Sequence, residues 1–111
     1  MPMSVNATLR TAILCRRPVE MHASGHLRKA CPHALGYKDE RLTVVVFQFF
    51  GETASAVSPA GLWRSFYLNE IAWVKMIDGP WRAGPHRILK IETSLDRIDM
   101  EVLPWGLAQA P

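Results

Sequence analysis

The residues best suited to chemistry are histidines and cysteines in the first third of the chain. His22, His26, Cys31 and His33 follow one another closely, and imidazole and thiolate groups are common zinc ligands. Their spacing provides neither a CxxC pair nor an HxxxH pair on a helix, which are typical of zinc sites. We therefore expect structural histidines and no metal site, and a metal-dependent enzyme is the least favoured function.

The same residues allow a nucleophile hypothesis, in which Cys31 or Cys15 is activated by His33 or His22. A reactive thiol needs a lowered pKa, which neighbouring cations or a helix N-terminus supply. Nothing in the sequence places either cysteine in such surroundings, and free cysteines are usually buried and inert. We predict two free thiols, no catalytic residue and no cofactor.

Cations interleaved with aromatic residues form a second candidate site. Arginine and lysine hold phosphates, while aromatic rings stack on bases. The predicted ligand-binding residues are Arg28, Lys29, Arg41, Arg64, Tyr37 and Tyr67. The alternative is that the aromatic residues belong to the core and that the cations are merely solvated.

Size and charge limit the class of protein. The chain has 111 residues and a net charge of +3, which suits one domain. Residues 1–41 hold seven basic and three acidic side chains, and a basic half can attract phosphates. No apolar run is long enough to span a bilayer, and the N-terminus lacks the pattern of a signal peptide. We expect a cytoplasmic bacterial protein without a membrane partner.

The hydrophobic periodicity predicts one short helix followed by strands. Asn6 can cap the helix, and Pro18 ends it. The predicted strands cover residues 19–23, 26–31, 42–50, 62–68 and 71–77, with turns at 24–25 and 36–40 and a loop over 51–61. Pro32 is expected to end the second strand, because proline cannot donate to a sheet ladder.

Strand 42–50 is the most apolar segment, and Thr43 and Gln48 are its only polar residues. A strand that is apolar on both faces is normally covered on both sides. One face would fill a barrel core, and the other needs the helix, the C-terminal tail or a second subunit. Leaving Phe47 and Phe49 exposed to water would forgo several kcal/mol, so we expect a homodimer.

The predicted fold class is mostly β: a small five-stranded barrel with a short N-terminal helix. We expect a disordered N-terminus over 1–5, the barrel over 6–80, and a C-terminal extension over 81–111 that packs on the barrel or on a partner. Within the extension, residues 88–103 fit a pair of strands or a short helix. We favour strands, because apolar residues there alternate with charged ones.

Most of the chain, about residues 9–78, resembles the core of WYL domains. The segments that carry the resemblance are LRTAI, RPVEMHASGHLRKACPHALGY, ERLTVVVFQFFG and WRSFYLNEIAWVKMID. The resemblance implies an Sm-like or SH3-like five-stranded barrel that senses ligands or binds nucleic acid in bacterial transcription regulation. The chain departs from the family, because Leu42-Thr43-Val44 replaces Trp-Tyr-Leu and both arginines of the F-R-L-D-R-I motif are missing from 66–71. The family's ligand therefore does not carry over.

The predicted function is a non-enzymatic, WYL-like regulatory or accessory module that binds an anionic ligand. That ligand is a nucleotide or a single-stranded nucleic acid. The alternative is a protein–protein interaction module without a small ligand, which docks a regulatory partner protein through its apolar strand and tryptophans.

Overall fold

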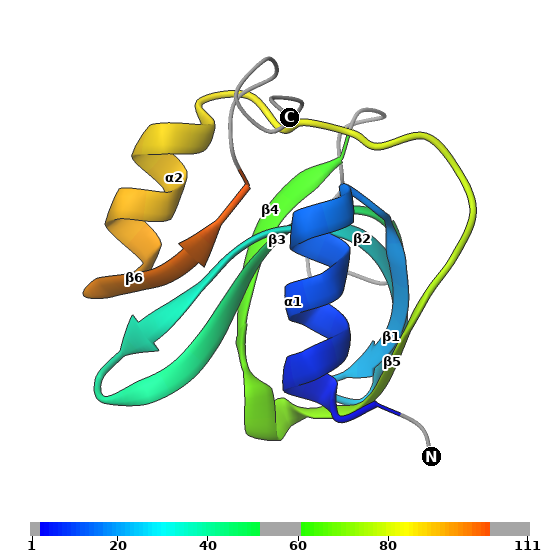
Figure 1. The fold of residues 1–111 in the computed structure, drawn as a ribbon, viewed down its shortest axis with the longest axis horizontal. Coiled ribbons are helices and arrows are strands. Elements are labelled where there is room, and N and C mark those ends of the chain that lie inside the picture. The colour runs from blue at the N-terminus through cyan, green and yellow to red at the C-terminus, as the bar shows by residue number, and fades with distance from the viewer. Residues whose placement is uncertain (1–2, 52–60, 103–111) are drawn as a thin grey trace.

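The computed structural model describes residues 3–51 and 61–102 of the chain. Its elements are α1 (Val5–Cys15), β1 (Val19–Ala23), β2 (His26–Lys38), β3 (Arg41–Gly51), β4 (Leu62–Tyr67), the 3-10 helix η1 (Leu68–Glu70), β5 (Ile71–Met76), α2 (Arg87–Ser94) and β6 (Arg97–Glu101) (Figure 1). The mostly-β class with a short N-terminal helix is confirmed. The described residues form six strands rather than five, and most of the predicted loop over 51–61 lies outside them.

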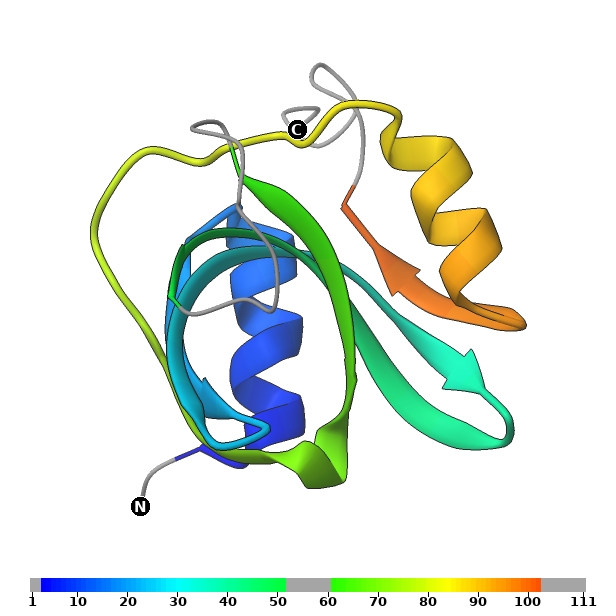
Figure 2. The ribbon, with the colours of Figure 1, turned by 180° about the vertical axis from the view of Figure 1, so that it is seen from behind.

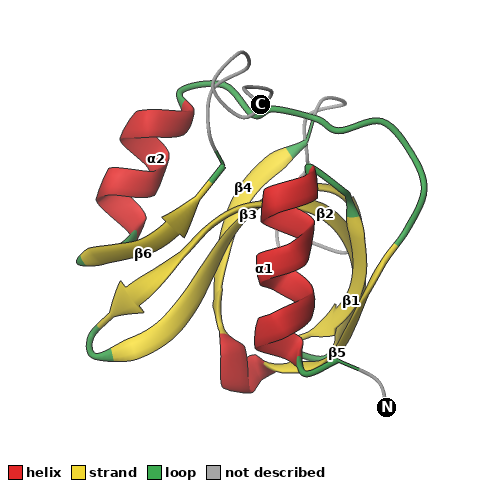
Figure 3. Ribbon diagram, viewed as in Figure 1, coloured by secondary structure: helices red, strands yellow, loops and turns green. Residues whose placement is uncertain are grey.

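All six strands belong to one antiparallel sheet. Its order is β4-β3-β2-β1-β5, and β6 pairs with β2 away from this path. The first half of β2 pairs with β1 and its second half with β6, so one long strand serves two neighbours along the same edge. The sheet curls so that β1 and β5 lie along one side of α1, as the front and back views show (Figures 1 and 2). The single turn of η1 joins β4 to β5 (Figure 3).

The second strand is longer than predicted: the expected end at Pro32 is wrong, and the expected turn over 36–40 is correct only for its last two residues. β2 continues to Lys38, and its pairing with β3 shifts register between Pro32 and Ala34. The shift leaves His33 without a partner in that ladder, which is how a sheet accommodates proline without a lost donor bond. The turn consists only of Asp39 and Glu40, both with positive φ.

Helix α1 starts earlier than predicted. The hydroxyl oxygen of Ser4 accepts a 3.1 Å hydrogen bond from the backbone N–H of Ala7, so Ser4 is the N-cap. Asn6, the predicted cap, accepts a hydrogen bond from Arg10 Nε instead. Ser4 and Val5, which we expected to be disordered, are the cap and the first residue of the helix.

Two hydrophobic clusters lie on opposite faces of the β2–β3 hairpin. On the inner face, α1 packs with Leu9 and Ile13 against Val44 and Val46 of β3. On the outer face, Ile91 and Leu95 of the C-terminal segment pack against Ala34 and Val45. The alternation of Val44, Val45 and Val46 between the two clusters shows that β3 is covered on both faces.

The cover of the outer face comes from this chain itself. The predicted strand pair over 88–103 is wrong, because residues 87–94 form helix α2 and only 97–101 form a strand. α2 lies beside β6 and the β2–β3 hairpin, separated from α1 (Figure 3). An uncovered face on β3 therefore no longer argues for a homodimer, which stays a prediction. Neither helix of the described segments has the length and hydrophobicity of a transmembrane span.

Candidate nucleic-acid interface

The outer surface of the sheet stays open where β5, β1, β2 and the end of β3 lie side by side. Cross-strand pairing aligns Trp73 with His22 and His22 with Leu27 in one row. The next row runs Lys75–Glu20–Lys29–Phe50. We call these side chains the outer aromatic patch: Trp73, His22, Leu27, Lys75, Glu20, Lys29 and Phe50.

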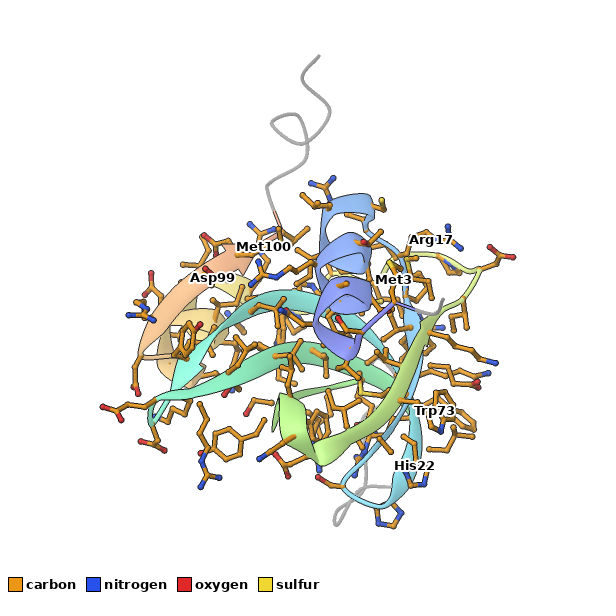
Figure 4. All side chains as sticks on the ribbon, turned by 60° about the horizontal axis from the view of Figure 1, so that its bottom comes forward. Met3, Arg17, His22, Trp73, Asp99 and Met100 are labelled. Atoms are coloured by element: carbon orange, nitrogen blue, oxygen red, sulfur yellow. The ribbon has the colours of Figure 1, made fainter. Side chains whose placement is uncertain are left out.

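The large apolar side chains of the outer aromatic patch are strongly exposed. Phe50 is 52% exposed and Trp73 is 41% exposed, although both belong to strands. The imidazole of His22 lies 6.5 Å from the Trp73 ring, and Figure 4 shows the two side chains next to each other on the outside of the sheet. Exposed rings of this size on a small domain usually mark a binding surface.

A lysine lies over each of these rings. Lys29 Nζ is 5.0 Å from the centroid of Phe50, and Lys75 Nζ is 5.9 Å from a ring of Trp73. Lys75 also forms an ion pair with Glu20 at 3.3 Å. The patch therefore combines two lysines and one carboxylate with two accessible rings. This arrangement can stack bases while holding the phosphates between them.

The six predicted ligand-binding residues do not form one site. Lys29 lies in the outer aromatic patch. Arg28, its neighbour on β2, points to the opposite, inner face and is only 2% exposed, so it is not a surface cation. Arg64 lies on the inner side too, since both guanidinium groups contact the Phe66 ring.

The other three predicted residues lie at the tip of the β2–β3 hairpin. Arg41 stacks on the Tyr67 ring at 5.0 Å, and the Tyr67 hydroxyl donates to Asp39. Tyr37 carries a different cation, Arg97, at 4.4 Å. Carboxylates share this tip with the cations, so its charges offset one another and its attraction for phosphate is weak.

The Cys31–His33 pair is buried and unsuited to nucleophilic chemistry. His33 Nδ1 contacts the Cys31 carbonyl oxygen at 2.8 Å, not the sulfur. Burial raises the pKa of the Cys31 thiol, which disfavours the reactive thiolate. The free state of Cys15 and Cys31 is confirmed. Among the described residues, no group of three His, Cys, Asp or Glu side chains is placed to hold a metal ion.

His33 lies between two tryptophans. Its ring centroid is 4.8 Å from those of both Trp63 and Trp81. Its Nε2 atom is buried without a hydrogen-bond partner, and desolvation lowers the pKa of His33 to about 4. The histidine is thus a neutral core residue at neutral pH.

Comparison of the chain with family models, with curated proteins and with solved structures gave no match. The candidate site therefore depends on its own geometry.

Sequence reasoning missed most of the outer aromatic patch. The alternation that predicted β1 and β5 also places His22 beside Glu20 on one face, and Trp73 beside Lys75. That signal was present in the sequence. The position of Phe50 was not, because a register shift between Lys29 and Ala30 brings Phe50 opposite Lys29.

Proposed function

We propose that the protein is a non-enzymatic regulatory or accessory module that binds single-stranded nucleic acid across the outer aromatic patch. The observation that carries the proposal is the pair of exposed rings, Trp73 and Phe50, each with a lysine over it. A sheet surface with stacking rings and cations is the usual means by which small β domains hold single strands.

The proposed path for the strand crosses the sheet from β5 to β3. Three inter-strand spacings separate these strands, roughly 14 Å in all. Trp73 and Phe50 would stack bases at the two ends, and Lys29 and Lys75 would contact the phosphates between them. Because these contacts recognise ring faces and phosphates, binding should tolerate many base sequences.

The finer fold assignment and the cellular role belong to the same proposal. The strand order β4-β3-β2-β1-β5, with a 3-10 turn between β4 and β5, supports an Sm-like or SH3-like barrel. The sequence resemblance to WYL domains supports a cytoplasmic role in bacterial transcription regulation. The exposed rings support nucleic acid over the anionic small ligands that such a module could also sense.

The test is a fluorescence-anisotropy titration with labelled single strands of about ten nucleotides over a salt series. Trp73→Leu and Phe50→Leu keep an apolar side chain but remove the stacking ring. Each should weaken binding about 5- to 150-fold, the equivalent of about 1–3 kcal/mol per stacked base. Lys29→Gln should reduce the salt dependence, log K against log salt, by about 0.7.

The matched control is Tyr37→Leu, which removes an equally cation-stacked ring from the hairpin tip. It should leave the affinity unchanged. Absence of binding by the unmodified protein even at low salt would reject the proposal, as would equal losses in Tyr37→Leu and Trp73→Leu. A titration with a mononucleotide separates strand binding from nucleotide binding.

A second candidate, a protein–protein interaction module, is favoured by one observation on α2. Ile88 and Leu89 are 64% and 58% exposed, and beside them is a groove of about 330 Å³ that Ala83 and Gly84 help to line. Exposed apolar pairs of this kind suit a partner surface. Recovery of one stoichiometric protein from the native cell, lost in Ile88→Lys, would favour this function over nucleic-acid binding.

A further inference from the structure

A polar pocket lies between the C-terminal end of α2 and the sheet near the tip of the β2–β3 hairpin. Its volume is about 350 Å³, which is within the range of roughly 300–1,000 Å³ that small-molecule sites have. Figure 1 shows that the C-terminal end of α2 is the end nearer to this hairpin. Most of the described side chains that line the pocket carry a hydroxyl group: Thr43, Ser65, Tyr67, Thr93 and Ser94.

Two of these hydroxyl groups are available to a ligand. Among the described residues, neither the Ser65 hydroxyl nor the Ser94 hydroxyl has a hydrogen-bond partner. The hydroxyl groups of Thr43 and Thr93 each donate to a backbone carbonyl oxygen of their own strand or helix, at 2.9 Å. A hydroxyl oxygen that donates can still accept. The pocket thus offers two groups that both donate and accept, and further groups that accept.

The charged side chains of the lining are Lys38 and Glu70, and both already have partners. Lys38 Nζ lies 3.7 Å from Asp96 Oδ1. The two oxygens of Glu70 accept hydrogen bonds from the Ser24 hydroxyl at 2.8 Å and from the Tyr67 N–H at 2.7 Å. Opposite charges around one pocket offset each other, and the partial negative charge at a helix C-terminus opposes an anion there. The pocket therefore favours an uncharged ligand over a phosphate.

We propose that this pocket binds a neutral polyhydroxy compound of the size of a monosaccharide. Each hydroxyl group of such a ligand both donates and accepts, as the hydroxyl groups of Ser65 and Ser94 do. Tyr67 supplies the ring in the lining, and Arg41 already lies over that ring at 5.0 Å, so an aromatic base gains little by stacking there. Because Ser65 belongs to β4 and Ser94 to α2, the ligand connects the helix to the sheet.

The test is an NMR titration that follows the amide signals of the full chain. The probes are D-glucose, D-galactose, myo-inositol and D-ribose, and the last of them distinguishes the sugar of a nucleoside from a free hexose. At least one probe should shift the signals of Ser65 and Ser94 saturably, with a Kd of about 1–10 mM for a ligand of this size. Absence of a saturable shift with all four would overturn the proposal. Larger shifts of the same signals with sodium phosphate would also overturn it, because the pocket would then be an anion site.

Substitutions at the two available hydroxyl groups locate the binding. Ser65→Ala and Ser94→Ala should each raise the Kd about 2- to 10-fold, the effect of one lost hydrogen bond. Thr11→Ala is the matched control, because it removes a hydroxyl group from α1, outside the pocket, and it should leave the Kd unchanged. Equal Kd values in all three variants would contradict binding in this pocket.

A variant that fills the pocket gives the largest expected effect. Ser65→Phe adds a ring at an exposed strand position, so the fold should tolerate it, and it should abolish the saturable shifts. Binding that persists in this variant would overturn the proposal.

This inference does not depend on the proposed function. Trp73→Leu should weaken oligonucleotide binding and keep the shifts that the sugar induces. Ser65→Phe should do the reverse.

Discussion

The outer surface of the sheet carries two groups of aromatic residues, of which one is exposed and the other is covered. Trp73 and Phe50 stay exposed on the β5–β1–β2 side, whereas Phe47 and Trp63 on the β3–β4 side are packed against each other at 5.3 Å. Phe47 and Phe50 even belong to the same strand. The difference comes from cover rather than from residue type, because the C-terminal segment contacts Trp63 on β4 and the Cys31–His33 part of β2.

The covering segment is held by specific contacts. The Trp63 indole N–H donates to the Pro85 carbonyl oxygen at 2.7 Å. The backbone N–H of Arg82 donates to the Cys31 sulfur at 3.3 Å, and the Arg82 guanidinium lies over the Phe49 ring. Gly84 sits so close to Trp63 that a Cβ there would come within 2.5 Å of the indole. The buried group is therefore structural, and the exposed group is the one that we propose for binding.

The sharpest test of this difference compares two phenylalanines of β3. Phe47→Ala should lower the free energy of unfolding by about 3–5 kcal/mol, because Phe47 is 4% exposed and its loss leaves a cavity. Phe50→Ala should change the free energy of unfolding by less than about 0.5 kcal/mol, because an exposed side chain buries little surface on folding. Urea denaturation of both variants measures the effect. Equal losses would mean that Phe50 is covered in solution, and the binding-surface interpretation would then fail.

Lowering the pH should lower the free energy of unfolding through His33, which packs against Trp63 in the buried group. The folded-state pKa of His33 is about 4, below its ordinary value of 6.5. The unfolded chain therefore binds more protons between these pH values, so the free energy of unfolding falls as the pH drops from about 6.5 to 4. The total loss from this residue is about 3 kcal/mol.

Urea unfolding at a series of pH values measures this loss. His33→Gln should remove this part of the pH dependence, whereas His22→Gln, on the outer aromatic patch, should retain it. An identical pH profile in His33→Gln and the unmodified protein would contradict the assignment of His33 as the buried neutral group.

Local patterns in the sequence predicted most of the elements that pair with close neighbours. β1 has the predicted bounds, because alternation and the Ser24-Gly25 turn are local signals. The second half of β2 was missed, since Pro32 ends most strands and only the shift past His33 lets this one continue. β6 pairs with β2 across a long stretch of chain, and no local pattern encodes such a partner.

The candidate site was predictable only in part. Lys29 was found because it is a cation on an alternating strand. Arg28 is also a cation on the same strand, but its hydrogen-bond partners, Ala23 and Gln48, come close to it only in the folded sheet. Trp73 was not among the predicted ligand-binding residues, because a tryptophan on a strand is more often core than exposed.

Adding a methyl group at Gly84 should weaken the packing of the C-terminal segment on the sheet. Gly84→Ala would force its Cβ against the side chains of Trp63 and Phe47, at 2.5 and 2.6 Å. We expect a loss of about 1–3 kcal/mol in the free energy of unfolding, the usual cost of overpacking. The substitution should also increase the rate of amide hydrogen exchange more in α2 than in α1. Ala83→Ser, at the exposed neighbouring position, is the control, and a Gly84→Ala protein with unchanged exchange would contradict the tight packing.

The smallest expected effect concerns Glu20, which is the one carboxylate of the outer aromatic patch and pairs with Lys75 at 3.3 Å. Lys75 is largely exposed, so this ion pair contributes little to folding, and Glu20→Gln should change the free energy of unfolding by less than about 0.5 kcal/mol. The same change removes a negative charge from the proposed path of the phosphates and releases Lys75 to contact one of them. Affinity for single strands should therefore rise, and the slope of log K against log salt should steepen by up to about 0.7.

Asp78→Asn removes the carboxylate of another exposed ion pair, with Arg17, outside the patch, and should leave both quantities unchanged. Equal effects of the two substitutions would mean that affinity depends on the net charge of the protein and not on the position of the charge in the patch.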